Sequence, residues 1–112
     1  MAPKFNRKKG ARRSFLKNLI QNLIMIEKIE TTETRAKAIR PIAERLVSIA
    51  KKGQLANLRV LISRISNKRA AMKLFYEIAP KYKERVGGYL RIVKLGGARK
   101  RDAAKMARVE FL

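Results

Sequence analysis

Apolar residues recur at helical spacing in four stretches of the chain, at residues 14–26, 33–52, 54–65 and 67–82. This spacing predicts four amphipathic helices, each with one face toward a core. Pro41 lies inside the second stretch, where we expect it to kink one continuous helix rather than divide it. Pro80 is expected to bend or end the fourth helix.

Three shorter stretches alternate between apolar and polar residues or are rich in strand formers, at residues 29–32, 89–95 and 106–112. A Thr before Glu33 is suited to cap a helix that follows the first strand directly. A strand that leads straight into an amphipathic helix indicates a helical layer packed on a sheet. The sequence therefore predicts an α+β fold of a helix, a strand, three helices and a β-hairpin, forming a small three-stranded sheet covered by helices on one face.

The chain has 112 residues, of which 46 % are hydrophobic, so we expect one folded domain over residues 1–112. Within this domain, residues 1–13 form a basic N-terminal arm, and residues 96–105 form a basic loop at the tip of the hairpin. A long loop of this kind usually has a function.

The net charge is +21, from 29 Lys and Arg against 8 Asp and Glu. Such an excess costs self-repulsion, which a polyanionic partner relieves, and nucleic acid is the strongest candidate. The charge is densest on the arm and the hairpin tip, where Lys and Arg would pair with phosphates. The candidate RNA-binding residues are Lys4, Arg7, Lys8, Lys9, Arg12, Arg13, Lys17, Arg91, Arg99, Lys100, Arg101 and Lys105. Tyr82 and Tyr89 could stack on bases, but a place in the core fits them better.

Cysteine and histidine are absent from the sequence, which excludes disulfides, thiolate and imidazole chemistry and the usual zinc ligands. No phosphate-cradling glycine loop or nucleophile elbow occurs. Glu27, Glu30 and Glu33 fit strand-surface and helix-terminus positions better than a metal site, because a hard cation needs converging oxygen ligands. We expect no catalysis, cofactor, metal or small-molecule substrate.

Three segments, in this order, resemble one known family. They are E-K-I-E-T-T-E-T-R-A-K-A-I-R-P-I-A-E-R-L-V-S-I-A-K at 27–51, K-L-F-Y-E-I-A-P-K-Y at 73–82 and G-G-Y-L-R-I-V-K-L-G at 87–96. Together they are similar to segments of the bacterial large-subunit ribosomal protein seventeen family. The pattern R-x-x-x-x-R-x-x-x-L-x-N-L that starts at Arg7 also resembles the family, although this N-terminus is shorter and lacks the family's histidines.

The resemblance implies a mixed sheet in which the first strand pairs with the last. It also implies a structural constituent of the large ribosomal subunit in the cytoplasm, which binds and stabilises large-subunit ribosomal RNA near the peptide exit tunnel, beside neighbouring ribosomal proteins.

The residues alone leave two alternatives open. One is a basic DNA-binding or nucleoid-associated protein. The other is a cationic membrane-surface protein that rests on its first helix, whose apolar stripe would then be exposed. A membrane-spanning segment is not expected, because Asn18, Gln21 and Asn22 interrupt the short apolar run.

Overall fold

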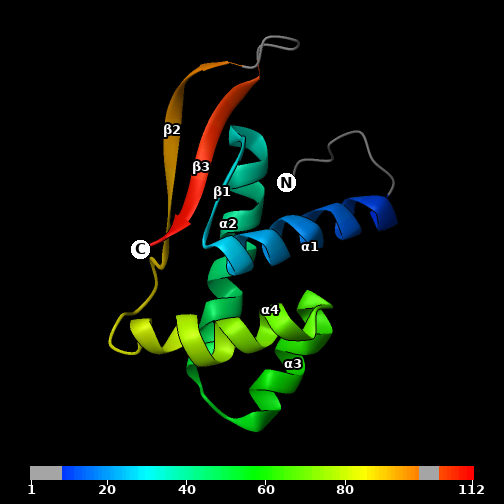
Figure 1. The fold of residues 1–112 in the computed structure, drawn as a ribbon, viewed down its shortest axis with the longest axis vertical. Helices are drawn as coiled ribbons and strands as arrows, with labels where there is room; N and C mark the ends of the chain where they lie inside the picture. Colours follow the sequence, from blue (N-terminus) through cyan, green and yellow to red (C-terminus); the bar gives the residue numbers. More distant parts are fainter. Residues whose placement is uncertain (1–8, 99–103) are drawn as a thin grey trace.

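A computed structural model describes the backbone of residues 9–98 and 104–112 and the side chains of residues 14–96 and 104–112. Its elements are α1 (Lys9–Ile26), β1 (Lys28–Thr32), α2 (Glu33–Lys51), α3 (Leu55–Ile65), α4 (Lys68–Lys73), β2 (Leu90–Ala98) and β3 (Lys105–Phe111) (Figure 1). After α4 the chain continues through a π-helical turn (Leu74–Ile78) and a 3-10 turn (Ala79–Tyr82). This order of helices and strands confirms the predicted α+β fold.

The three strands form one sheet in the order β1-β3-β2, so the first strand pairs with the last. Val109 of β3 lies between Ile29 of β1 and Ile92 of β2. Both pairings are antiparallel, and the expectation of a mixed sheet was therefore wrong. The reason is that β1 and β2 both begin beside the end of β3, since Lys28 lies opposite Glu110 and Leu90 opposite Phe111.

The hairpin strands extend further than predicted. Residues 96–98 belong to β2 and Lys105 to β3, so these residues are not part of the tip loop as we expected. Two more residues of β2 than of β3 lie between the pairs Lys94–Ala107 and Ala98–Lys105, which is a bulge that contains Gly96. Glycine is common at such bulges, because the extra residues need backbone freedom. Residues 99–103 of the predicted loop lie outside the described part of the chain.

Helix α1 begins at Lys9, earlier than the predicted start at Ser14. The predicted start of the first helix at Ser14 was therefore wrong by five residues. Lys, Ala and Arg are favourable helix formers, and Gly10 lies in the first turn, where it costs little. The arm residues before Lys9 lie outside the described part of the chain.

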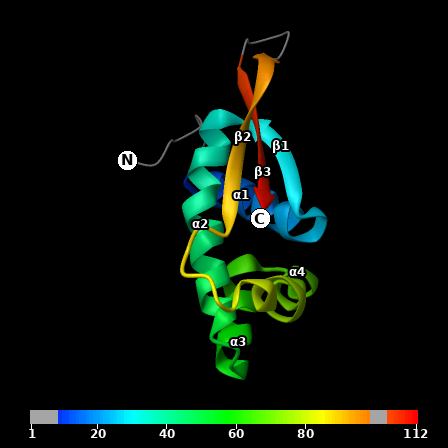
Figure 2. The same ribbon diagram turned by 90° about the vertical axis from the view of Figure 1, so that its left-hand side faces the viewer.

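Helix α2 is central to the fold, because it contacts α1, α3 and all three strands. As predicted, it runs as one helix through Pro41 and ends just before Gly53, whose φ is 71°. With α1 it covers one face of the sheet, and Figure 2 looks onto the other face. α3 and α4 lie near the end of α2 that is far from the hairpin tip (Figure 1).

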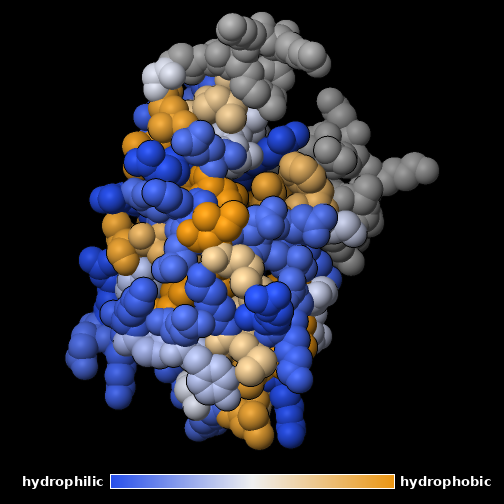
Figure 3. Space-filling model, viewed as in Figure 1, coloured by the Kyte–Doolittle hydropathy of each residue, from blue (hydrophilic) through white to orange (hydrophobic). Residues whose placement is uncertain are grey.

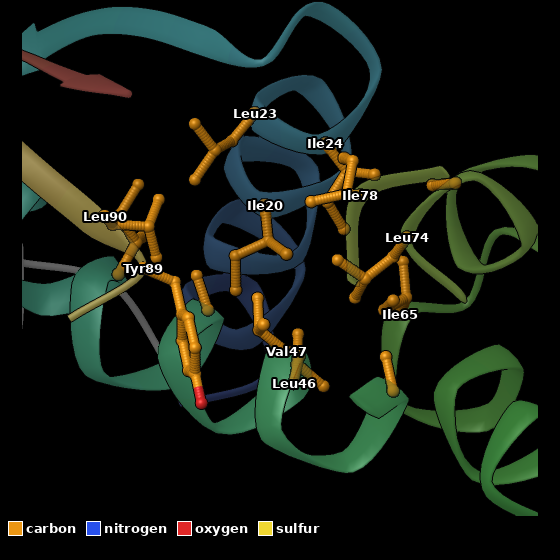
Figure 4. Close-up of a cluster of buried hydrophobic side chains, with 14 of the residues drawn as sticks. Ile20, Leu23, Ile24, Leu46, Val47, Ile65, Leu74, Ile78, Tyr89 and Leu90 are labelled. Atoms are coloured by element: carbon orange, nitrogen blue, oxygen red, sulfur yellow. The ribbon is translucent and has the colours of Figure 1, made fainter. Parts of the chain in front are cut away.

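The core gathers side chains from every layer of the fold (Figure 4). Leu23 of α1, Val47 of α2 and Leu74 after α4 are at most 1 % exposed. Ala107 and Val109 face this cluster from the covered face of the sheet. Removal of this apolar surface from water is the main driving force for folding.

Tyr82 and Tyr89 are core residues, as predicted, with 5 % and 3 % of their surface exposed. Their ring centroids are 5.3 Å apart. The Tyr82 hydroxyl donates to the Leu112 carbonyl oxygen at 2.5 Å, and burial raises the pKa of Tyr82. The Lys51 ammonium donates to the Tyr89 hydroxyl at 2.8 Å and thereby lowers the pKa of Tyr89. Because both rings are occupied within the protein, they are not stacking platforms for bases.

Candidate nucleic-acid interface

The predicted RNA-binding residues fall into three structural groups. Those outside the described part of the chain are Lys4, Arg7, Lys8, Arg99, Lys100 and Arg101. Those on the described backbone of α1, without described side chains, are Lys9, Arg12 and Arg13. The remaining three, with described side chains, are Lys17, Arg91 and Lys105.

The three described candidates do not form one cluster. Arg91 and Lys105 are both exposed, but they lie near opposite ends of the β2–β3 pair. Lys17 is half-buried on α1, and its ammonium nitrogen lies 3.0 Å from the Ser66 hydroxyl at the end of α3. The structure therefore places predicted cations on two separate regions, the hairpin and the helical layer.

Arg91 is already partly neutralised by the protein. Its Nε donates to Glu110 Oε1 at 2.6 Å, while Arg108 Nε donates to Glu110 Oε2 at 3.2 Å. The hydrogen bond from Arg91 is the main reason why the pKa of Glu110 is lowered. Since Glu110 occupies both arginines on the open face of the sheet, Arg91 is a weaker phosphate-binding candidate than the sequence suggested.

Lys17 has two neighbours that the sequence prediction missed, Arg45 of α2 and Arg64 of α3. These three cations line a groove of about 210 Å³ together with apolar side chains. The apolar lining consists of Leu16, Ile20, Ile42, Leu46 and Ile65. Among the described side chains, none of the three cations forms an ion pair with an acid. The groove thus joins an apolar floor to a rim of positive charge.

A sequence signal for this groove exists, although it is weak. Lys17, Arg45 and Arg64 each adjoin a residue of the apolar stripe on their own helix. Such positions lie at the edge of the buried face, where a long side chain can cover apolar surface and keep its charge in water. That the three edges meet is a result of tertiary packing, which the sequence pattern does not contain.

A second hollow, of about 360 Å³, lies where α2 meets the start of β2, and Lys37, Arg40 and Glu44 are among its lining residues. Glu44 is used structurally, because its carboxylate oxygens accept the backbone N–H groups of Tyr89 and Leu90 at 3.2 and 3.0 Å. Lys37 and Arg40 are exposed, and neither forms an ion pair within the described part of the chain.

Comparison with known proteins identifies the family. The sequence model described as ribosomal protein L17 matches residues 15–112. The chain belongs to this family. A protein named large ribosomal subunit protein bL17 from Persephonella marina is 50 % identical over 109 residues, which cover 96 % of this chain and 88 % of that protein. Proteins of the same name from Desulforudis audaxviator and a Hydrogenobaculum species are 48 % and 44 % identical. The match to the Desulforudis audaxviator protein covers 90 % of this chain and 89 % of that protein. The match to the Hydrogenobaculum protein covers 96 % of this chain and 92 % of that protein.

In this L17-family chain the few acids neutralise only a small part of the positive charge. Glu27 lies 3.5 Å from Lys73 and 3.7 Å from Lys81, and Glu33 lies 3.9 Å from Lys94. Figure 3 shows hydrophilic side chains over much of one face, interrupted by small apolar areas. Exposed Lys or Arg side chains occur on α2, α3, β2 and β3, so the described cations are spread over several elements rather than confined to one pocket.

The described residues contain no group of three or more His, Cys, Asp or Glu that could hold a metal ion. Within the same residues, none of the helices is long and apolar enough to cross a membrane. The apolar stripe of α1 packs into the core, where Ile20, Leu23 and Ile24 are at most 4 % exposed. This packing removes the surface that a membrane-bound first helix would have required.

Proposed function

We propose that this chain is a structural constituent of the large ribosomal subunit, in the cytoplasm, which binds large-subunit ribosomal RNA and stabilises its folded structure. The proposed position is near the peptide exit tunnel, beside neighbouring ribosomal proteins. Membership of the L17 family supports the ribosomal assignment. The observation that supports RNA binding is the excess of surface cations that lack an acid partner among the described residues.

Helix α1 strengthens this proposal, because it continues the helical layer into the basic N-terminal segment. Positions 9, 13 and 17 are successive turns apart, and residues four apart lie on the same side of a helix. A rigid helix can present such positions at fixed spacing along an RNA backbone. The candidate residues on the arm and in the hairpin loop would add further phosphate contacts.

Binding depends on electrostatic attraction between cations and phosphates and on the tertiary shape of the RNA, and it includes no catalytic step. Lys and Arg pair with phosphates, and Arg can also stack on unpaired bases. The described part of the chain contains no exposed aromatic pair of the kind that reads single-stranded RNA in a standard sheet-based module. Base identity would therefore contribute less than the tertiary shape of the RNA.

The test is sedimentation of a tagged full-length chain with large ribosomal subunits, followed by a high-salt wash. We expect the chain to stay with the subunit and to cross-link to proteins at the tunnel exit. A parallel competition experiment, with duplex DNA and large-subunit RNA fragments as competitors at equal salt, distinguishes RNA binding from the DNA-binding alternative. Displacement of the chain by duplex DNA, and not by large-subunit RNA fragments, would contradict the proposal.

A further inference from the structure

Buried apolar side chains form the floor of the groove that is lined by Lys17, Arg45 and Arg64. Ile20, Leu46 and Ile65 come from three different helices and are at most 5 % exposed. Leu16 and Ile42, which are half-buried, form the part of the lining that meets solvent. α1, α2 and α3 contact one another in pairs, so packing of the whole helical layer fixes the shape of the groove. The groove is therefore a stable feature of the fold and does not depend on one loop.

The rim of the groove selects the chemistry of its occupant. Its charged groups among the described side chains are hydrogen-bond donors, one ammonium and two guanidinium groups, and the ammonium of Lys17 keeps further N–H donors beside the one given to the Ser66 hydroxyl. Among the residues that the structure describes, no acid lines the groove. The ligand that fits is a flat apolar group that carries acceptor atoms on its edge and lies between anionic groups. In RNA every base has this arrangement, since a phosphate stands on either side of it along the backbone.

We infer that the groove receives one unstacked pyrimidine of ribosomal RNA, with the adjoining phosphates on Lys17, Arg45 and Arg64. This inference rests on the proposed RNA-binding function. The volume of about 210 Å³ is sufficient, since a cavity of about 150 Å³ lined by Leu, Ile and Phe can take a benzene ring. Uracil is the pyrimidine chosen for the test, because its two carbonyl oxygens can accept hydrogen bonds from the cations of the rim. Sequence-specific RNA recognition commonly uses such splayed bases from loops and bulges.

The test compares two short RNAs with the same number of phosphates. One is a stable abasic backbone with a single central uridine, and the other is wholly abasic. The full-length chain should bind the uridine-containing RNA roughly tenfold more tightly, because only this RNA can bury a base against the apolar floor of the groove. Ile42→Phe fills the groove and should reduce affinity for this RNA to that of the abasic RNA, whose own affinity stays unchanged. Val60→Phe is the control, because Val60 lies on α3, is partly exposed and does not line the groove.

Nuclear Overhauser contacts provide a second measurement, which needs no variant to fold. Methyl groups of Leu16 and Ile42 in the unmodified chain should show contacts to the H5 and H6 protons of uracil. Equal affinity for the two RNAs, without these contacts, would overturn the groove assignment and leave the proposed function intact. Competition by an acidic peptide with one leucine, in the absence of base dependence, would assign the groove to a protein partner instead. Failure of the chain to bind large-subunit RNA fragments of any kind would contradict the proposed function itself.

Discussion

Thr32 is the residue at which strand β1 becomes helix α2. Its hydroxyl oxygen accepts the backbone N–H of Arg35 at 3.3 Å and so satisfies one of the unpaired donors of the first turn. Thr32→Ala should lower the free energy of unfolding by about 1 kcal/mol. Urea unfolding measures this loss. Thr32→Ser, which keeps the hydroxyl, and Thr34→Ala, two residues further on, should each cost much less. Equal losses in all three variants would show that the cap is not the cause.

Glu110 makes stability depend on pH in a defined direction. Its pKa is lowered in the folded protein, chiefly by the hydrogen bond from Arg91. A lowered folded-state pKa means that the carboxylate stabilises the fold above its unfolded pKa of about 4.3, and that this contribution is lost as pH falls through the folded-state pKa.

Glu110→Gln should therefore be less stable than the parent chain at about pH 7, and this difference should shrink below about pH 4. Unfolding free energies measured across this range test the prediction. Glu84→Gln is the matched control, because Glu84 is exposed and forms no ion pair among the described residues. A difference for Glu110→Gln that stays constant with pH would contradict the ion-pair explanation.

At the scale of elements, α1 joins the core to the basic N-terminal segment. Leu23 is fully buried in α1, and Leu23→Ala should cost about 2–5 kcal/mol of the free energy of unfolding, because it leaves a cavity. Thermal unfolding measures this loss. Met25→Ala on the same helix should cost far less, because Met25 is 36 % exposed. If the two variants are equally stable, the stripe of α1 does not pack as described.

The N-terminal segment should show the opposite behaviour. Deletion of residues 1–8 removes Lys4, Arg7 and Lys8 but none of the core residues. The unfolding temperature should change little. Affinity for a large-subunit RNA fragment should fall, because the deletion removes cations that would pair with phosphates. The salt dependence of binding should also become weaker with each phosphate contact that is lost. Titration of the RNA at several salt concentrations checks both effects. A deletion that unfolds the chain while Leu23→Ala stays stable would reverse these two assignments.

Elements could be predicted from the sequence wherever a periodic pattern was present. Spacing of apolar residues located α2 and α3, and Thr32 and Gly53 marked the ends of α2. The early start of α1 was missed, because the segment before Ser14 has no apolar stripe and only its favourable helix formers indicate a helix. The long β2 was missed because Gly96 reads as a loop residue, although a bulge also accommodates it. Arg45 and Arg64 were missed, because only tertiary packing brings them near Lys17.

At the scale of the whole molecule, one property governs both stability and binding. The net charge of +21 repels itself in the free chain, and only a few acids on the described surface offset it. Salt screens this repulsion over a distance of about 10 Å at 0.1 M. The same salt weakens the attraction between cations and phosphates. The free chain and the RNA complex should therefore respond to salt in opposite directions.

We expect added salt to raise the unfolding temperature of the free chain and to lower its affinity for large-subunit RNA. The affinity should fall with a log–log slope of about −0.7 to −0.9 for each neutralised phosphate, because each contact releases counterions. Six to ten contacts would reduce affinity by roughly 10³–10⁵ between 50 and 200 mM salt. Calorimetry of the free chain and filter binding of the complex over the same salt series measure the two effects. A flat binding response together with a rising unfolding temperature would show that the charge destabilises the free chain without contributing to RNA binding.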